Sequence, residues 1–268
     1  MSNIEKALEK AAKEHKRFDG ETVEPVLPYV AESFDENKVD EHIVSYYDSI
    51  GRQTWTRTVP VMESFRRLRL KIRNVFETNS YKTFAFVSAS QGEGKSTTTL
   101  NVAITLTQDI NCRVVVLDAD LRRPAIHRFL GLRPRKGLAN LLNNETDVGS
   151  VVMETFIPRL SILPAGDKPR NTCELLTSKK MGEIVATLKS QFDFVIIDTP
   201  PVLAFSETVP VCRLADGVIF VIEANHTKKR PVKRSLELLQ DCNVLGFVLN
   251  KEEIASSDYY GHIYKTNY

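Results

Sequence analysis

Six continuous apolar runs, rich in β-branched residues, recur between residues 83 and 250, and helix-length amphipathic segments separate them. A continuous apolar run is typical of a strand that is covered on both faces, which favours a mostly parallel sheet. The alternation therefore predicts a doubly wound α/β domain with functional sites at the carboxyl ends of its strands. The runs are TFAFVS (83–88), RVVVLD (113–118), LSILP (160–164), FDFVIID (192–198), GVIFVI (217–222) and LGFVLN (245–250).

The sequence divides into three parts. Residues 1–59 are predicted to form a helical or disordered N-terminal extension, 60–254 the α/β domain, and 255–268 a flexible tyrosine-rich tail. Residues 2–17 have the apolar stripe and the capping-box spacing of a short amphipathic helix. Such a helix either packs on its own domain or docks on a partner, because it is too short to be stable alone. The acidic, proline-containing sequence from 18 to 57 is typical of a linker.

Composition and charge exclude several classes of function. A net charge of +2 gives no indication of nucleic-acid binding. The four cysteines are far apart and form no CxxC pair, which argues against a zinc site or a disulfide framework. No stretch approaches the roughly 18–20 apolar residues that cross a bilayer, and the N-terminus has no apolar signal core. We therefore expect an intracellular protein that reaches a membrane only through a partner.

A glycine-rich loop, SASQGEGKSTTT (88–99), follows the first apolar run and fits the pattern GxxxxGK[ST], with alanine in place of the first glycine. Glycines let successive backbone N–H groups turn inward around a phosphate, and the helix that follows adds the positive end of its dipole. The lysine can reach the β- and γ-phosphates, and the serine hydroxyl can ligate Mg²⁺. The alternative is a merely structural turn. The predicted nucleotide-binding residues are Gln91, Gly92, Glu93, Gly94, Lys95, Ser96 and Thr97.

Carboxylates lie at the ends of two other apolar runs. Asp118 and Asp120 belong to VVVLDAD, and Asp198 ends VIID. Carboxylates at neighbouring strand ends beside a phosphate-binding loop can hold Mg²⁺, directly or through water, and can orient a nucleophile. A single aspartate of this kind is often only a helix cap, but two such strands favour chemistry. Asn250 ends the last run, where its amide either pairs with adenine or forms a turn.

A helix is predicted to begin at Pro60, because proline suits a first helical turn and apolar residues then recur on one face. Glu63, Arg66 and Arg69 share another face at i, i+3 and i+6. On pattern alone, a charged stripe of this kind is more often a solvated surface than an interface.

Four tyrosines, half of the eight in the chain, fall in the last eleven residues, DYYGHIYKTNY. Chance would place about a third of one tyrosine in a segment of this length. The segment is too polar for packing to explain its aromatic residues. The four are Tyr259, Tyr260, Tyr264 and Tyr268.

Together these motifs resemble those of the bacterial tyrosine kinases of exopolysaccharide and capsule loci, over the range Pro60 to Tyr268. The resemblance depends on SASQGEGKS as Walker A, VVVLDADLRRP as the A′ motif, VIIDTPP as Walker B, and the tyrosine-rich end of the chain. ESFRRLR also resembles the E-x-x-R-x-x-R self-assembly motif of that family. Glu207 is a minor departure, since kinases of this group often have Asp after DTPP.

The ParA/MinD-type ATPases are the rival interpretation, because they are fold relatives of these kinases. They carry a signature lysine in KGGxGK[ST], whereas this chain has Ser90 and Gln91 at the equivalent positions. They also lack a tail like DYYGHIYKTNY. Both interpretations imply the same fold, a P-loop NTPase of the ParA/MinD-like type.

The resemblance implies that the tail tyrosines are phosphate acceptors and that ATP and Mg²⁺ are the cofactors. Lys95 would stabilise charge on the phosphates, and Asp118 would help to activate the tyrosyl hydroxyl. Ser96, Asp118 and Asp198 would hold Mg²⁺. Asp120 would support the water shell of the metal. The implied catalytic residues are Lys95, Asp118, Asp120 and Asp198.

The resemblance further implies an autokinase that phosphorylates its tail in trans, within a ring-like homo-oligomer that assembles through Glu63, Arg66 and Arg69. Arg122 and Arg123 would contact phosphate or a neighbouring subunit. The kinase would regulate the polymerisation and export of an exopolysaccharide or capsule, with a membrane adaptor of the chain-length-determinant type and a phosphotyrosine phosphatase as partners. It would be cytoplasmic and recruited peripherally to the inner face of the cell membrane. The alternative is a ParA/MinD-like positioning ATPase.

Overall fold

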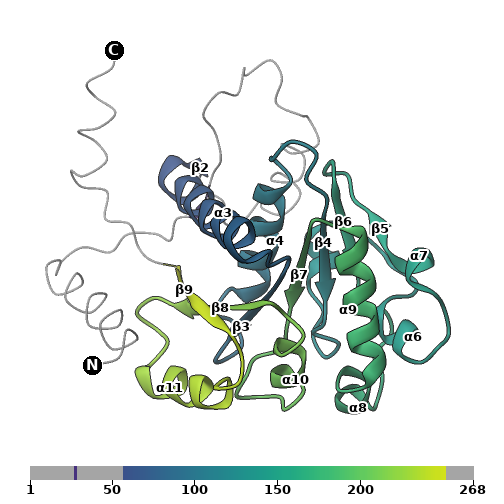
Figure 1. Ribbon diagram of the computed structural model, residues 1–268. Coiled ribbons are helices and arrows are strands. Elements are labelled where there is room, and N and C mark those ends of the chain that lie inside the picture. The colour runs from purple at the N-terminus through teal and green to yellow at the C-terminus, as the bar shows by residue number, and fades with distance from the viewer. Residues whose placement is uncertain (1–26, 29–56, 252–268) are drawn as a thin grey trace, which may run out of the picture. The chain divides into compact units, whose positions relative to one another are not determined.

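The computed structural model describes residues 27–28 and 57–251, and of 27–28 and 57–63 it describes the backbone only (Figure 1). The predicted helix at 2–17 and the four tail tyrosines therefore lie outside the described residues. All described residues belong to one compact unit. Within them, no helix combines the length and the apolar character that a membrane span requires.

A seven-stranded sheet forms the centre of this unit, in the order β5-β6-β4-β7-β3-β8-β9. Every neighbouring pair is parallel except β5 and β6, so the predicted doubly wound, mostly parallel sheet is confirmed. Two short strands, β1 (Leu27–Pro28) and β2 (Arg57–Thr58), form a separate parallel pair. The strands of the large sheet are β3 (Thr83–Ser88), β4 (Val114–Asp118), β5 (Met153–Glu154), β6 (Leu160–Leu163), β7 (Phe194–Asp198), β8 (Gly217–Glu223) and β9 (Val244–Asn250).

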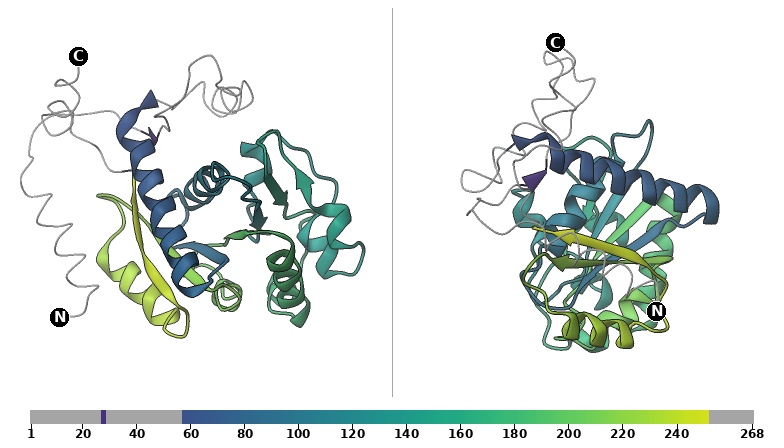
Figure 2. Two further views of the ribbon diagram at one scale, coloured as in Figure 1. Left: turned by 45° about the horizontal axis from the view of Figure 1, so that its top comes forward. Right: turned by 90° about the vertical axis from the view of Figure 1, so that its left-hand side faces the viewer.

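Side chains alternate between two cores, one on each face of the sheet. Figure 2 shows the helices that lie on both sides of the sheet. In β3, for example, Phe84 and Phe86 enter the core beneath α3 (Val59–Asn79) and α4 (Lys95–Leu106), whereas Ala85 and Val87 enter the opposite core. Because both faces are covered, the central strands are continuous apolar runs. The short α5 (Ile126–Phe129) joins the first core. The second core is covered by α6 (Leu138–Leu142), α7 (Val148–Val151), α8 (Thr172–Leu176), α9 (Lys179–Gln191), α10 (Thr208–Cys212) and α11 (Lys229–Leu238).

Helix α3 begins at Val59, one residue before the predicted start at Pro60. Its predicted apolar face is the one that packs, since Phe65 and Ile72 are buried. The ring of Phe76 lies 5.2 Å from the ring of Phe194 in the sheet, measured between centroids. The apolar period of this segment therefore reflects packing onto the domain.

The connections after β3 and β7 leave on opposite faces of the sheet, although these two strands are neighbours. After β3 the chain enters α4 on one face, and after β7 it enters α10 on the other. Adjacent parallel strands whose connections separate in this way leave a crevice at their carboxyl ends, where α/β proteins bind ligands. The loop after β3 is the predicted phosphate-binding loop, and β7 ends at Asp198.

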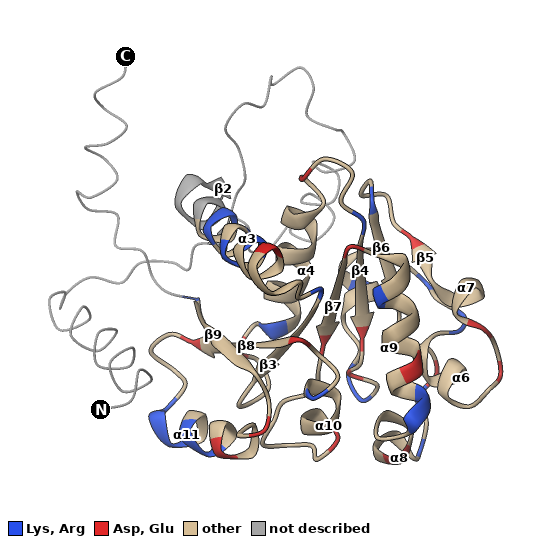
Figure 3. Cartoon of the chain, in the orientation of Figure 1, with Lys and Arg blue, Asp and Glu red and all other residues tan. Residues whose placement is uncertain are grey.

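Charge is unevenly distributed along the chain. Residues 57–251 contain 28 Lys and Arg against 19 Asp and Glu, a formal charge of +9, although the whole chain carries only +2. Figure 3 shows basic residues gathered on α11 and acidic residues at the ends of the central strands. The folded part of the chain is therefore basic, and the two flanking segments are acidic.

Candidate active site

The phosphate-binding loop lies between β3 and α4, where the sequence predicts it. Gly92 and Gly94 have φ angles of 89° and 84°, in the left-handed region that glycine adopts without steric cost. At Gly94 a side chain is also excluded by contact, because a Cβ atom there would lie 1.9 Å from Asn250 Nδ2. Helix α4 begins at Lys95, so the free N–H groups of its first turn are available to a phosphate.

The carboxylate of Glu93 supports this loop from inside the protein, where the residue is 3% exposed. Oε2 accepts the backbone N–H of Ser90 at 2.9 Å, and Oε1 accepts the hydroxyl of Thr227 at 2.6 Å. Of the predicted nucleotide-binding set, Glu93 is thus the member whose side chain holds the loop. Sequence patterns gave no signal for Thr227, which lies 134 residues away.

The end of β9 also holds the loop. The Asn250 side-chain amide donates to the carbonyl of Glu93 at 3.0 Å, and Lys251 Nζ donates to the carbonyl of Gly92 at 2.8 Å. Neither interpretation of Asn250 from the sequence, adenine pairing or a turn, anticipated this contact. Two side chains at the end of the last strand therefore hold the loop. The C-terminal tail follows these two residues directly in the sequence.

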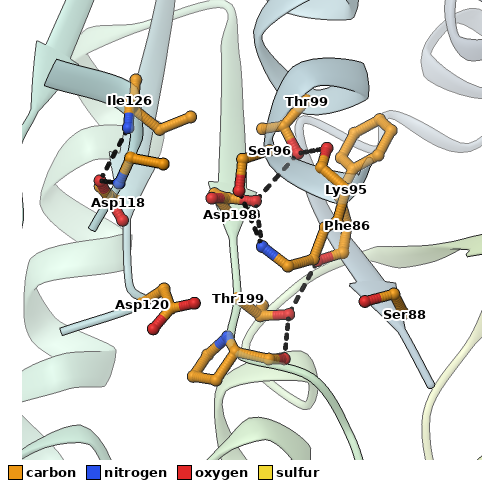
Figure 4. Close-up of polar contacts among 12 residues, drawn as sticks. Phe86, Ser88, Lys95, Ser96, Thr99, Asp118, Asp120, Ile126, Asp198 and Thr199 are labelled. Atoms are coloured by element: carbon orange, nitrogen blue, oxygen red, sulfur yellow. Dashed lines mark hydrogen bonds and ion pairs between the residues drawn. The ribbon is translucent and has the colours of Figure 1, made fainter. Parts of the chain in front are cut away.

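Lys95 and Asp198 form a buried ion pair at the crevice (Figure 4). Lys95 Nζ lies 2.6 Å from Asp198 Oδ1 and 3.2 Å from Ser96 Oγ. The hydroxyl of Thr99, one helical turn after Lys95, donates to the same Asp198 oxygen at 3.2 Å. The structure thus brings together three residues that the sequence predicts and a fourth, Thr99, that it does not.

Asp118 lies opposite Asp198 in the register of β4 and β7 and is fully buried. Its Oδ2 accepts the backbone N–H groups of Ala125 and Ile126, both at 3.2 Å. Burial and the negative charge of Asp198 together raise the pKa of Asp118 to about 8, and the positive charge of Lys95 opposes the shift. Asp118 therefore acts as a cap at the start of α5 and also keeps an oxygen for the crevice.

Two buried carboxylate oxygens at the crevice, Asp118 Oδ1 and Asp198 Oδ2, have no hydrogen-bond partner in the part of the chain that the structure describes. Buried polar atoms are almost always satisfied, so such oxygens indicate a missing cation or water. Mg²⁺ prefers oxygen ligands and in phosphate sites takes few of them from the protein, so these residues, with Ser96, fit the ion. The described residues contain no cluster of three or more His, Cys, Asp and Glu that could hold a metal by themselves.

Asp120 follows on the same side of the sheet and is 8% exposed. Its Oδ1 accepts the backbone N–H of Arg123 at 2.9 Å. Burial raises its pKa, while the charge of Lys95 opposes the shift. The side chain of Arg123 donates to Gln91 in the phosphate-binding loop. Arg123 therefore contacts the loop, where an incoming phosphate would bind.

Arg122 is engaged inside the domain. Its Nε lies 2.7 Å from Glu207 Oε1, and its guanidinium lies over the ring of Phe205 at 4.6 Å. Glu207 is 1% exposed, so this pair is buried on the acidic side. The pair joins the A′ segment to the loop after Walker B, at the position where the sequence departs from the family pattern.

The predicted assembly stripe is described in part, because the side chain of Glu63 lies outside the described residues. Arg69 faces its own domain, where Nη1 donates to the carbonyl of Thr105 at 3.2 Å and to Gln108 Oε1 at 3.3 Å. Asp109 lies 3.8 Å from the same nitrogen. Arg69 therefore stabilises the packing of α3 on α4, in addition to any role in assembly.

The fold and the site define a class: a P-loop NTPase with a mostly parallel sheet and a phosphate-binding loop beside two buried carboxylates. Residues 81–244 match the AAA domain family, which is consistent with this class. Over 206 residues the chain is 32% identical to the putative tyrosine-protein kinase CapB of Staphylococcus aureus, covering 76% of this chain and 90% of CapB. Over 202 residues it is 33% identical to the tyrosine-protein kinase YwqD of Bacillus subtilis, covering 75% and 85%. The chain belongs to the bacterial tyrosine kinase family, and it is a protein-tyrosine kinase by this kinship.

Solved structures agree with this assignment. The chimerical protein CapA2B2 matches with a TM-score of 0.70 and 26% identity, over 87% of this chain and 95% of the chimera. The septum site-determining protein MinD of Pyrococcus horikoshii matches with a TM-score of 0.57 and 23% identity, over 65% and 72%. The second match shows the fold alone. The positioning-ATPase alternative therefore depends only on a shared fold.

Proposed function

We propose that the chain is an ATP-dependent tyrosine autokinase that phosphorylates its own C-terminal cluster, Tyr259, Tyr260, Tyr264 and Tyr268. The observation that carries the proposal is the arrangement of Lys95, at the start of α4, beside Asp118 and Asp198 at the ends of the adjacent strands β4 and β7. A cation for phosphate charge and a carboxylate able to accept a proton are the two groups that phosphoryl transfer to a hydroxyl requires. Membership in the family supports the same reaction.

The acceptor proton is assigned to Asp118. Without a metal, burial and the charge of Asp198 raise its pKa to about 8, so the carboxyl holds a proton at neutral pH. A divalent cation nearby would lower this pKa, and the ionised carboxylate can then accept the tyrosyl proton. As the tyrosyl oxygen forms a bond to the γ-phosphorus, the bond to the β-γ bridging oxygen breaks, ADP leaves, and the tyrosyl proton passes to Asp118 Oδ1. A carboxylate bound directly to a divalent cation would be a weaker base, because the cation lowers its pKa. We therefore place Asp118 as the base and have it reach the metal through a water molecule.

Ser96 and Asp198 would hold Mg²⁺ directly and Asp118 would hold it through water, while Asp120 would support its water shell. When bound, Mg²⁺ supplies positive charge to the phosphate oxygens of ATP. Lys95 lies beside both proposed ligands and orients Asp198 through their ion pair. Backbone N–H groups of the loop from Gln91 to Thr97 would bind the phosphates.

Transfer is proposed to occur in trans within a ring-like homo-oligomer, with Glu63, Arg66 and Arg69 contributing to assembly. Assembly holds a neighbour's tail at high effective concentration beside the site. The similarity to the CapA2B2 chimera, which joins two Cap proteins in one chain, supports a membrane adaptor as partner. A phosphotyrosine phosphatase would reset the cycle. We place the kinase in the cytoplasm at the inner face of the cell membrane, where the cycle would regulate polymerisation and export of a capsule or exopolysaccharide.

A mixing experiment tests this proposal. The acceptor is full-length, isotope-labelled Lys95→Met, which lacks the catalytic cation, and the donor is a full-length chain with all four tail tyrosines changed to Phe. With Mg²⁺ and ATP, we expect phosphotyrosine on the labelled tail, detected by mass spectrometry. The acceptor alone is the control and should remain unmodified. An unmodified acceptor in the mixture, beside a wild-type chain that modifies itself, would show transfer in cis.

A further inference from the structure

Five exposed Lys and Arg side chains lie on one face of α11 and at the residue before it. None of them pairs with an acidic residue that the structure describes. Each of the five is exposed, and none forms an ion pair within the part of the chain that the structure describes. Figure 3 shows the concentration of Lys and Arg on this helix. We call this surface the basic face of α11; its residues are Lys228, Lys229, Arg230, Lys233 and Arg234.

The helical period places these cations close to one another. Lys229 and Lys233 are four residues apart, as are Arg230 and Arg234, so each pair lies side by side on the helix surface. The opposite side of the helix is buried through Val232. Like charges at this spacing repel one another and destabilise a helix. An anionic ligand would relieve that repulsion.

The basic face of α11 begins beside both the phosphate-binding loop and the root of the tail. Thr227, the residue before it, donates its hydroxyl to Glu93 of the loop at 2.6 Å. Lys251, the last described residue, lies 2.9 Å from Glu223 through its Nζ. The N–H of Ala224 also donates to the carbonyl of Asn250 at 2.8 Å. The tail therefore leaves the domain within a few residues of the first cation.

The tail has the length and the charge to reach this surface. Tyr259 is the eighth residue after Lys251, which allows about 28 Å when the chain is extended. The ten residues of α11 span only about 15 Å. Residues 252–268 carry three acidic residues against one lysine. Each phosphotyrosine adds about −1.5 to −2 charges at neutral pH. Phosphorylation therefore converts a weakly acidic segment into a strongly anionic one.

We propose that the basic face of α11 binds the phosphorylated tail of its own chain, an inference that depends on the proposed autokinase function. Charge-assisted hydrogen bonds from Lys and Arg to phosphate are among the stronger interactions available at a protein surface. Bound there, a modified tail is held away from Asp118, Asp120 and Asp198, whose carboxylates repel its phosphates. The surface thus removes the phosphorylated tail from the active site, and the active site is then free to bind an unmodified tail.

The test uses full-length protein, treated with phosphatase and kept without ATP. Its ligand is a fluorescent synthetic peptide of residues 252–268 with phosphotyrosine at 259 and 260, compared with the same peptide without phosphate. Lys229→Glu with Lys233→Glu reverses two charges of the basic face. Lys179→Glu with Lys180→Glu reverses two adjacent cations at the start of α9 and is the matched control. Binding is followed by fluorescence anisotropy, and vesicles containing phosphatidylserine are tested for cosedimentation with the same proteins.

We expect the phosphopeptide to bind the wild type and the α9 control equally, and the α11 variant at least about tenfold more weakly. The unphosphorylated peptide should bind all three weakly. Equal binding of the two peptides, or equal binding by the α11 variant, overturns the proposal. Vesicle binding that the α11 variant loses, without phosphopeptide binding by the wild type, overturns it in favour of a membrane surface. Because the peptide is synthetic, failure of autophosphorylation leaves this result interpretable.

Discussion

Lys95 Nζ lies 2.6 Å from Asp198 Oδ1, in a buried ion pair that joins the first turn of α4 to the end of β7. The pair holds the lysine of the phosphate-binding loop beside the proposed magnesium ligands before any nucleotide binds. A buried pair costs desolvation for both partners, so removal of one partner leaves an expensive unpaired charge. The pair therefore links the proposed catalytic lysine to the stability of the fold.

Replacement of Lys95 tests the role of the ion pair in the phosphorylation rate and in the stability of the fold. Lys95→Met should lower the rate of phosphotyrosine formation by on the order of 10²–10³, because the phosphates lose a preorganised cation. It should also lower the free energy of unfolding by about 3–5 kcal/mol, because Asp198 loses its buried partner. Adding Asp198→Asn should restore much of the stability without restoring activity. Urea unfolding and initial phosphorylation rates separate the two effects, and undiminished activity in Lys95→Met would refute the assignment of the loop.

Asp118 should make stability depend on pH in the absence of metal. The pKa of this carboxyl is raised from 3.8 to about 8 by burial and by Asp198, so from about pH 4 to pH 8 the folded chain keeps a proton that the unfolded chain has lost. The stability that this proton contributes is full below about pH 4 and is lost as the pH rises through 8. As the pH rises from 5 to 8, the free energy of unfolding of Asp118→Asn should therefore increase relative to that of the wild type by on the order of a few kcal/mol. Thermal unfolding with a chelator measures the gain, and a difference that does not vary with pH would contradict the raised pKa.

The contact between Gly94 and Asn250 can be measured by a double-mutant cycle. Gly92→Ala and Gly94→Ala should each cost about 1–2 kcal/mol of left-handed strain, but only Gly94→Ala also collides with Asn250. Asn250→Ala should therefore relieve part of the cost of Gly94→Ala and none of the cost of Gly92→Ala. Unfolding free energies and the affinity for a fluorescent ATP analogue are the measurements. Additive effects in both cycles would show that β9 does not hold the loop.

The assembly stripe gives a prediction about mass. Alanine at Glu63, Arg66 and Arg69 should convert a nucleotide-bound oligomer into monomers, and the change at Arg69 should also cost about 1 kcal/mol through its contacts with α4. Arg73→Ala is the control. Arg73 lies on the same helix, α3, and pairs with Asp109, but it is outside the stripe. Light scattering decides the outcome. An unchanged mass in the triple variant would make the stripe a solvated surface.

Much of the fold could be predicted because its strands are covered on both faces. TFAFVS and LGFVLN became β3 and β9 with boundaries that differ by at most one residue. The antiparallel strand Met153–Glu154 was missed, since two residues carry no period. The order of the strands was not predicted, because long-range pairing leaves no local pattern.

The site was predictable where local motifs define it. Lys95, Ser96 and Asp198 come together as their motifs predict, and Asp118 lies in register with Asp198. Contacts that join distant segments were missed, such as the pair of Arg122 with the buried Glu207 across 85 residues. Such pairs depend on how the strands are ordered. The roles of the site residues in catalysis remain predictions.

Mapping of phosphotyrosine by mass spectrometry, after incubation of purified full-length protein with Mg²⁺ and ATP, tests the proposed activity most directly. We predict phosphate on the tail cluster, at Tyr259, Tyr260, Tyr264 and Tyr268, and its absence from Lys95→Met treated in the same way. Release of ADP should accompany the modification. ADP release without any phosphotyrosine would contradict the kinase assignment and favour an ATPase of the positioning type.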